Sequence, residues 1–452
     1  MPEPLIAPIT TGGAPFVGGT LFDLAPLGYD QAEFTLSGTA SAYARAADGL
    51  SVVEEAAYTT RVLVHRPTDP GAFNGTVWVE WLNVSGGLDA APDWSFVHTE
   101  LMRSGAAWVG VSAQAIGVHG GEGIVGMSSP GLVGTDPARY GTLEHPGDRF
   151  SYDIYSQAGR AVRHAAGTLL GGLGVERALA IGESQSAFRL TTYANDIDPI
   201  AEVFDGFLVH ARGGTGAPLS DGDDPLAAMS GDPVRFRADR RVPVLCVQAE
   251  TDLMNLGYLP ARQDDDESFV LWEIAGTSHA DVYVLSVGAI DTGALPLAEL
   301  AQAWRPSREV LGMELDLPVN AGPQHYVMNA AVSHLDRWLR DRTRPPAAAR
   351  MEVVDGAFVT DEHGNVRGGI RTPHVDVPVA VLSGLGNGGA ALGFLAGSTT
   401  PFDAGKLAAL YPSRADYSSR FDAATDAAVD AGFVLAADAP EIKAVAAENS
   451  PI

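Results

Sequence analysis

A short segment of this chain places a serine where a strand should turn sharply into a helix. An apolar run that begins at Ala178 ends at Gly182, and the chain continues as Gly-Glu-Ser-Gln-Ser through Ser186. Ser184 stands at the centre, and a helix-compatible segment follows. A strand-to-helix turn of this kind lifts a serine hydroxyl out of a sheet, where it can act as a nucleophile. The segment favours a hydrolytic enzyme; the alternative is an ordinary turn in which Ser184 caps a helix.

The small residues on either side of Ser184 have a steric reason. The nucleophile in such a turn has a positive φ, and the flanking chain segments pass close to it. The usual pattern ends in glycine, whereas this chain has Ser186. Serine is still small, so we expect the turn to close.

A serine hydroxyl needs a base within hydrogen-bond reach, and the base needs an orienting acid. In this architecture they follow in the chain order serine, acid, histidine. Two acids follow the apolar run 242–248: we predict Asp252, a few residues past the expected strand, and keep Glu250 in reserve. His279 follows the next apolar run, 268–274, in a glycine-containing loop, and is the predicted base.

Other histidines are less well placed to act as the base. His325 lies in a Gly-Pro-Gln-His-Tyr segment with no strand before it, and we interpret it as a residue that lines the substrate pocket. Three more histidines rank below it: His119, His145 and His210.

The tetrahedral intermediate of acyl transfer carries an oxyanion that needs two preorganised donors. We expect one donor to be the backbone N–H of Gln185, directly after the serine. We expect the other to be Val84 or Ser85, in a glycine-containing loop after an apolar strand. Asn83, at the start of that loop, is predicted to line the substrate pocket.

Apolar strands alternate with helix-compatible segments along most of the chain. Strands are expected at 33–45, 58–66, 76–83, 107–113, 178–182, 204–210, 242–248 and 268–274, and helices at 96–104, 152–170 and 329–339. The alternation predicts an α/β fold with a mostly parallel central sheet and helices on both faces. Active sites in such sheets lie at the carboxyl ends of the strands, where the candidate residues fall.

The expected domain organisation is a large core with additions. We predict a core over 1–346, with an irregular N-terminal arm and insertions at about 213–240 and 280–318, the second partly helical and able to form a cap. A basic, proline-terminated stretch at 340–346 indicates a boundary. Residues 347–452 are predicted to be a C-terminal elaboration packed on the core.

Composition and charge exclude several classes of partner. The 452 residues are 46% hydrophobic and 19% charged, which is typical of a globular protein with a large core. The net charge of −27 argues against nucleic acid or an anionic membrane, since phosphate binding needs clustered Lys and Arg. The longest uncharged run, 377–402, is interrupted by Gly, Asn and Pro, which favours a buried segment over a membrane span.

Few signals point to metals, cofactors or export. The acidic groups near 221–224 and 264–267 lack the spacing of a calcium loop, and no Cys/His cluster suits zinc. The glycine-rich stretch 119–123 lacks the lysine of a phosphate loop. The single cysteine, Cys246, allows no intrachain disulfide, and the first residues do not resemble a signal peptide. We therefore expect no metal, no cofactor and a cytoplasmic location; a homo-oligomer stays open.

With these residues placed, the chain resembles the α/β-hydrolase superfamily, and within it a group of long bacterial "α/β-hydrolase domain" proteins. The phrases that carry the resemblance span nearly the whole chain: Glu80-Trp-Leu-Asn-Val-Ser-Gly-Gly87, Gly182-Glu-Ser-Gln-Ser186, Phe204-Asp-Gly-Phe207, Glu250-Thr-Asp252, Ala275-Gly-Thr-Ser-His279, Gly322-Pro-Gln-His-Tyr326, Gly369-Ile-Arg-Thr-Pro373 and Leu410-Tyr-Pro412. The resemblance implies a serine hydrolase, in the first place a carboxylic ester hydrolase, that needs no cofactor.

Together these patterns predict a serine esterase that acts on a small-molecule ester. Ser184 would attack the ester carbonyl, His279 would move the proton, and Asp252 would orient His279. Two alternatives remain: an acyltransferase with the same triad, and a non-catalytic binding protein on a hydrolase fold.

Overall fold

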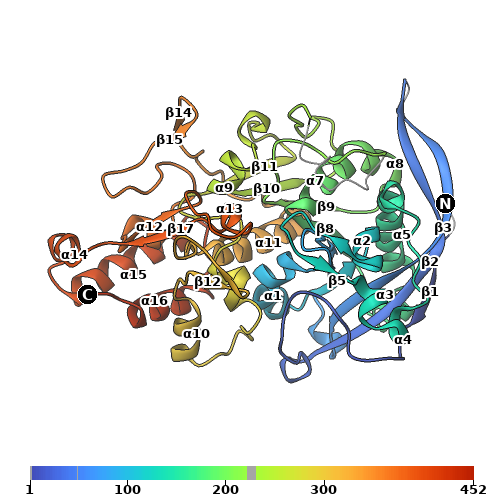
Figure 1. The fold of residues 1–452 in the computed structure, drawn as a ribbon, viewed down its shortest axis with the longest axis horizontal. Coiled ribbons are helices and arrows are strands. Elements are labelled where there is room, and N and C mark those ends of the chain that lie inside the picture. Colours follow the sequence, from blue (N-terminus) through green and yellow to red (C-terminus); the bar gives the residue numbers. More distant parts are fainter. Residues whose placement is uncertain (1–2, 48, 221–230) are drawn as a thin grey trace.

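The computed structural model describes residues 3–47, 49–220 and 231–452, and its centre is a nine-stranded sheet (Figure 1). The order is β1-β2-β3-β5-β4-β8-β9-β10-β11. The six strands from β5 to β11 are parallel to their neighbours, whereas β1, β2 and β3 form an antiparallel edge that joins β5. The strands are β1 (Leu5–Pro8), β2 (Tyr29–Ala46), β3 (Gly49–Pro67), β4 (Thr76–Trp81), β5 (Ala107–Val111), β8 (Arg177–Glu183), β9 (Gly206–His210), β10 (Val244–Ala249) and β11 (Phe269–Ile274). The predicted mostly parallel sheet is confirmed.

Helices cover both faces of the sheet because successive strand residues point to opposite sides. In β4, Trp78 joins the core beneath α1 (Pro92–Ser104) and α11 (Gln324–Asp341). Its neighbours Val77 and Val79 join the core beneath α5 (Ser151–His164) and α7 (Gln185–Thr192). The strands are buried on both sides, which is why they read as continuous apolar runs.

Shorter elements connect and extend this framework. Around the core they are α2 (Ala115–His119), β6 (Gly121–Glu122), β7 (Ser128–Ser129), α3 (Gly131–Thr135), α4 (Pro137–Tyr140), α6 (Ala166–Leu169), α8 (Asp198–Ala201) and α9 (Glu250–Met254). The expected insertion at 280–318 contains the π-helical turn η7 (Tyr283–Val287), α10 (Leu297–Ala303), β12 (Glu309–Val310) and β13 (Met313–Glu314). Of the other expected insertion, 221–230 lie outside the described residues, and the described remainder forms no helix or strand.

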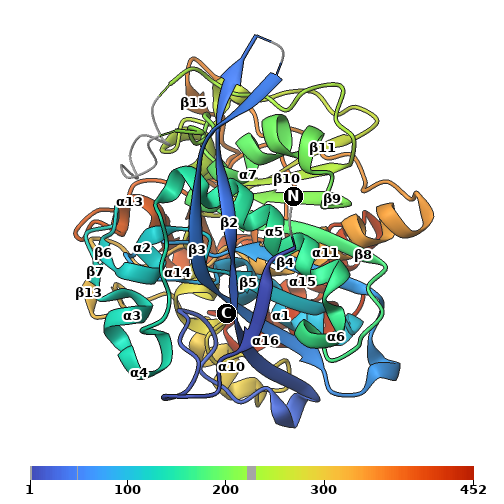
Figure 2. The same cartoon turned by 90° about the vertical axis from the view of Figure 1, so that its right-hand side faces the viewer.

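The C-terminal segment lies at the opposite end of the molecule from the β2–β3 hairpin, which runs across the face turned toward the viewer in Figure 2. Its elements are β14 (Val353–Val354), β15 (Ala357–Phe358), α12 (Pro373–Asp376), β16 (Ala380–Ser383), α13 (Gly393–Ala396), β17 (Ser398–Pro401), α14 (Ala404–Leu410), α15 (Arg414–Asp430) and α16 (Ala439–Glu448). Tyr417 and Phe421 of α15 share a hydrophobic cluster with Tyr326 and Leu335 of α11. The segment therefore packs on the core, and none of the helices described is long and apolar enough to cross a membrane.

A buried ion network holds the antiparallel edge to the loop after β4. Arg61 of β3 donates to Glu33 of β2 at 2.8 Å and to Asp89 at 2.7 Å, and all three side chains are fully buried. Its Nε also donates to Ser112 Oγ at 2.9 Å. Asp89 belongs to the loop that runs from β4 to α1, so this network fixes a segment next to the candidate oxyanion residues.

We expect Arg61→Met to lower the free energy of unfolding by about 3–5 kcal/mol, because it leaves the buried Asp89 carboxylate without its cation. The matched control is Arg45→Met, since Arg45 pairs with Asp196 at the surface with a side chain that is 70% exposed. That change should alter the free energy by no more than about 1 kcal/mol. Urea denaturation of both variants measures the difference, and equal effects would contradict the structural role of the network.

Candidate active site

Ser184 occupies the sharp turn that the motif predicts. β8 ends at Glu183, α7 begins at Gln185, and Ser184 between them has φ 59° and ψ −121°. A non-glycine residue with positive φ is strained, and such strain concentrates at functional sites. A Cβ on Gly182 would lie 3.1 Å from Ser186 Cβ, so the turn needs small residues at both positions. The serine at 186 meets that requirement.

The structure brings Ser184, His279 and Asp252 into one hydrogen-bonded chain. His279 Nε2 lies 2.8 Å from Ser184 Oγ, and His279 Nδ1 lies 2.7 Å from Asp252 Oδ1. Asp252 lies in α9 directly after β10, and His279 lies in the loop after β11. Because β8, β9, β10 and β11 are parallel neighbours, their carboxyl ends deliver these side chains to the same edge of the sheet.

Glu250, the reserve acid, serves a different purpose. Its Oε1 accepts a hydrogen bond from Gly276 N at 2.6 Å, and its Oε2 accepts one from Gly384 N at 2.8 Å. Burial raises the pKa of Glu250 to about 7. Glu250 therefore ties the loop that carries His279 to the C-terminal segment, while Asp252 contacts the imidazole.

A second carboxyl group lies against His279 on the side of Ser184. Glu183 Oε1 is 3.0 Å from His279 Nε2, the same nitrogen that contacts the serine. Asn83 Nδ2 holds Glu183 in place by donating to its Oε2 at 3.2 Å and to its main-chain oxygen at 3.1 Å. Sequence reasoning missed this contact because the position before the serine is variable in the motif; the available signal was an acid directly before the nucleophile.

The two carboxylates control the charge of His279. Burial disfavours the imidazolium, but the charge on Glu183 and the hydrogen bond and charge of Asp252 outweigh it and raise the pKa of His279 to about 9. Burial likewise raises the pKa of Glu183 to about 7, against the opposing effect of His279. His279 is thus protonated near neutral pH, and the neutral base forms as the pH rises. The two groups titrate as a pair.

The predicted oxyanion donors line one cavity beside Ser184. Gln185 N–H is in the first turn of α7 and has no partner within the helix. Val84 N–H makes no hydrogen bond to any described residue. Ser85 N–H donates to Asn83 Oδ1 at 2.8 Å, so the geometry favours Val84 over Ser85 as the second donor. The side chain of Asn83 makes its hydrogen bonds to Glu183 and Ser85. It therefore positions these residues and does not line the cavity, which corrects its predicted role.

This cavity has a volume of about 320 Å³, and its wall combines apolar and polar side chains. Its lining residues are Val84, Ser85, Gln114, Ala115, Ile116, His119, Gly120, Glu122, Asp148 and Gln185. Asp148 accepts hydrogen bonds from Gln114 Nε2 at 2.7 Å and from Arg189 Nη2 at 2.9 Å. The cavity is therefore preorganised, and its size suits a small ligand.

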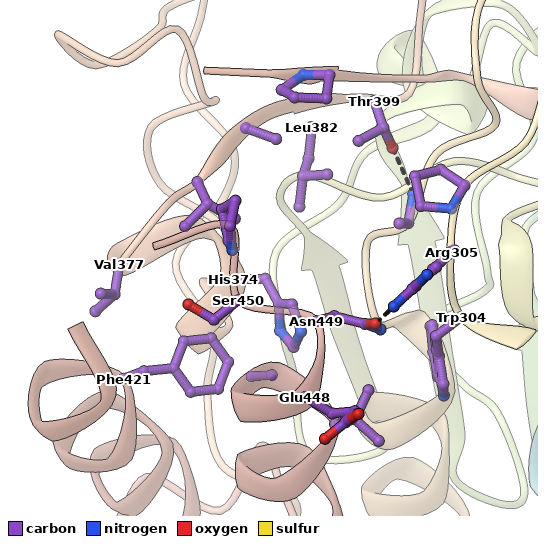
Figure 3. Close-up of a pocket in the computed structure, with 18 of the residues that line it drawn as sticks. Trp304, Arg305, His374, Val377, Leu382, Thr399, Phe421, Glu448, Asn449 and Ser450 are labelled. Atoms are coloured by element: carbon purple, nitrogen blue, oxygen red, sulfur yellow. Dashed lines mark hydrogen bonds between the residues drawn. The ribbon is translucent and has the colours of Figure 1, made fainter. Parts of the chain in front are cut away.

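A larger cavity, of about 450 Å³, lies between α10, the β16–β17 hairpin and the C-terminal helices (Figure 3). Apolar side chains dominate its wall, including Trp304, Val377, Leu382 and Phe421. None of the residues predicted for the reaction lines it.

His325 is not part of the site beside Ser184, which corrects its interpretation as a pocket residue. It lies buried in the first turn of α11, where Nδ1 bonds to Phe96 O at 2.5 Å and the ring stacks on Tyr283. The start of α11 packs against α1, so the side chain faces a buried helix interface. Among the other histidines, His119 lines the cavity, whereas His210 is buried against Asp93 at 2.9 Å.

A family model described as an alpha/beta hydrolase domain matches residues 2–444. Among solved structures, one from a study of two esterases of Rhizomucor miehei is 13% identical with a TM-score of 0.33, and the match covers 69% of this chain and 85% of that one. The glucuronoyl esterase from Solibacter usitatus is 11% identical with a TM-score of 0.29, covering 59% and 71%. Both likenesses are weak. No curated protein sequence gives a significant match.

Glu183→Gln removes a negative charge from the imidazole and should lower the pKa of His279. We expect the pH at which Ser184 is half-maximally reactive toward phenylmethylsulfonyl fluoride to fall by roughly one unit, which is about 1.4 kcal/mol of lost stabilisation of the imidazolium. Glu122→Gln, a change in the wall of the same cavity, is the control and should leave this pH unchanged. An unchanged or raised midpoint in Glu183→Gln would contradict the assignment.

Inactivation by phenylmethylsulfonyl fluoride at one fixed pH distinguishes the roles of Asp252 and Glu250. Asp252→Asn should slow inactivation about 10³–10⁴-fold, because the imidazole loses the partner that fixes its tautomer. Glu250→Gln should slow it less than about tenfold, since Glu250 does not contact His279. The reverse order of effects in folded variants, checked by circular dichroism, would show that Glu250 is the orienting acid.

Proposed function

Because this chain belongs to the α/β-hydrolase family, we propose that it is a serine hydrolase that cleaves carboxylic esters through an acyl-enzyme intermediate. The observation that carries the proposal is the hydrogen-bonded chain of Ser184, His279 and Asp252, with distances of 2.8 and 2.7 Å. A nucleophile on a strained turn, a base in contact with it and an acid behind the base form the arrangement that acyl transfer needs.

The proposed reaction has two halves. Neutral His279 takes the proton of Ser184 Oγ as the oxygen attacks the ester carbonyl carbon, and the N–H groups of Gln185 and Val84 stabilise the oxyanion. Collapse of the tetrahedral intermediate expels the alcohol, which receives the proton from His279 Nε2. A water molecule then attacks the acyl-enzyme by the same route, releasing the carboxylic acid and restoring the serine.

The cavity beside Ser184 favours a small substrate. At about 320 Å³ it is near the lower end of small-molecule sites, which span roughly 300–1,000 Å³. Glu122 in its wall disfavours an anionic substrate, whereas the charge of Asp148 is compensated by Arg189. We therefore expect short, uncharged esters to be cleaved in preference to long-chain or acidic ones.

Hydrolysis of p-nitrophenyl acetate by the full-length protein tests the proposal. Ser184→Ala should lower kcat roughly 10⁴-fold or more, because the nucleophile is lost. Ser186→Ala is the matched control: its buried hydroxyl has no hydrogen-bond partner in the described part of the chain, so we expect kcat within about threefold of the original.

Equal activity in the original protein and Ser184→Ala would refute the proposal, as would no activity toward any short ester. Product analysis in the presence of a competing alcohol shows whether water or the alcohol accepts the acyl group. Free acid as the main product supports hydrolysis, whereas transfer of the acyl group to that alcohol would make the protein an acyltransferase.

A further inference from the structure

Three side chains with metal-binding groups meet far from Ser184 in the sequence. Asp291, His325 and Glu441 each offer one ligand atom, and these atoms lie within 4.8 Å of one another. Asp291 follows η7, His325 is in the first turn of α11, and Glu441 is in the first turn of α16. The cluster thus joins the 280–318 segment, a core helix and the C-terminal helix. Its members are too far apart in the chain for a spacing motif to reveal them.

The imidazole of His325 is held in the form that binds metals. Nδ1 lies 2.5 Å from the carbonyl oxygen of Phe96, and a carbonyl can only accept, so the proton is on Nδ1. In the neutral ring Nε2 therefore carries the lone pair, which accepts a long hydrogen bond from Asn329 Nδ2 at 3.4 Å. A backbone carbonyl that fixes the tautomer in this way is a common feature around metal-bound histidines.

Neutral donors orient both carboxyl groups. Tyr283 donates its hydroxyl to Asp291 Oδ2 at 2.9 Å, and Gly293 N donates to Asp291 Oδ1 at 2.8 Å. Tyr326 donates its hydroxyl to Glu441 Oε1 at 3.0 Å. Such bonds fix the directions of ligand oxygens without neutralising their charge.

The charge of Arg103 acts on Glu441, but Arg103 makes its ion pairs with other acids. In the described ranges, neither Asp291 nor Glu441 forms an ion pair with a lysine or arginine, and Arg103 pairs instead with Glu100 and Asp438. Asp291 is buried and Glu441 is half-buried, and two such carboxylates that face one another are costly unless a proton or a metal ion compensates them. A divalent cation would remove this repulsion.

A buried amide next to the cluster has an unused oxygen. Asn329 is fully buried one helical turn after His325, and its Oδ1 has no hydrogen-bond partner among the described residues. Its Nδ2 lies 3.4 Å from His325 Nε2 and 3.2 Å from Asp438 Oδ2, so the amide group borders the imidazole. A buried amide oxygen without a partner needs an explanation, and a cation beside His325 would supply one once the amide turned its oxygen, in place of Nδ2, toward the imidazole.

We propose that Asp291, His325 and Glu441 form a binding site for a divalent transition-metal ion, with Zn²⁺ as the best match. One imidazole nitrogen with carboxylate oxygens suits zinc, whereas Ca²⁺ and Mg²⁺ prefer ligand sets made of oxygen alone. The ion connects three separate parts of the chain, and it holds α16 and the 280–318 segment against α11. Tyr326, which also lines the 450 Å³ cavity of Figure 3, makes the metal site a neighbour of that cavity.

Zinc binding to the full-length protein, stripped with EDTA and desalted, tests this proposal. Isothermal titration with Zn²⁺ should give about one ion per chain, and saturation should raise the melting temperature. Glu441→Gln and Asp291→Asn should each weaken binding by about tenfold or more and remove most of the thermal shift. Glu448→Gln, an exposed position on the same helix, is the matched control and should bind as the original protein does.

The proposal is overturned if the original protein binds no Zn²⁺, or if both variants bind it with unchanged affinity. If the variants fail to fold, X-ray absorption spectroscopy of the zinc-loaded original protein tests the proposal instead, because it identifies the atoms that bind the ion. One imidazole nitrogen with oxygen ligands is the expected ligand set. Two or more imidazoles would place the ion elsewhere in the protein and contradict the site.

Discussion

The constraint on which the site depends is the alignment of parallel strand ends at one edge of the sheet. Glu183 ends β8 and Ser184 follows it, Asp252 follows β10, and His279 follows β11, so the imidazole meets groups from three strands of the parallel part of the sheet. A shift of one strand by a single residue would turn its side chains to the other face. The pairing of β8 with β9, of β9 with β10 and of β10 with β11 sets the register, and the register sets the distances at His279.

The loops that carry the site are held from outside the sheet as well. Glu250 bonds to the backbone of Gly276 and of Gly384, and Thr251 Oγ1 donates to Gly384 O at 2.6 Å while accepting from His279 N at 3.2 Å. The C-terminal segment therefore takes part in positioning the acid and the base.

The sequence predicted the features that follow from local pattern and chain order. Ser184, Asp252 and His279 were identifiable because each follows an apolar strand, and parallel strand ends must meet. Side-chain direction was not predictable: the occupied N–H of Ser85 and the burial of His325 depend on long-range packing. The start of α1 at Pro92 was missed for the same reason, since the carboxylate that accepts from its first N–H groups is the buried Glu80 in β4.

The central claim is that Ser184 is a nucleophile activated by His279. Rapid quenching of the reaction with p-nitrophenyl acetate, followed by peptide mass spectrometry, tests it most directly because the acyl group is seen on the residue that carried out the attack. The account predicts an acetyl group on the peptide that contains Ser184, and a strong decrease of that species in His279→Ala. An acetyl group on another residue, or equal acetylation without His279, would contradict it.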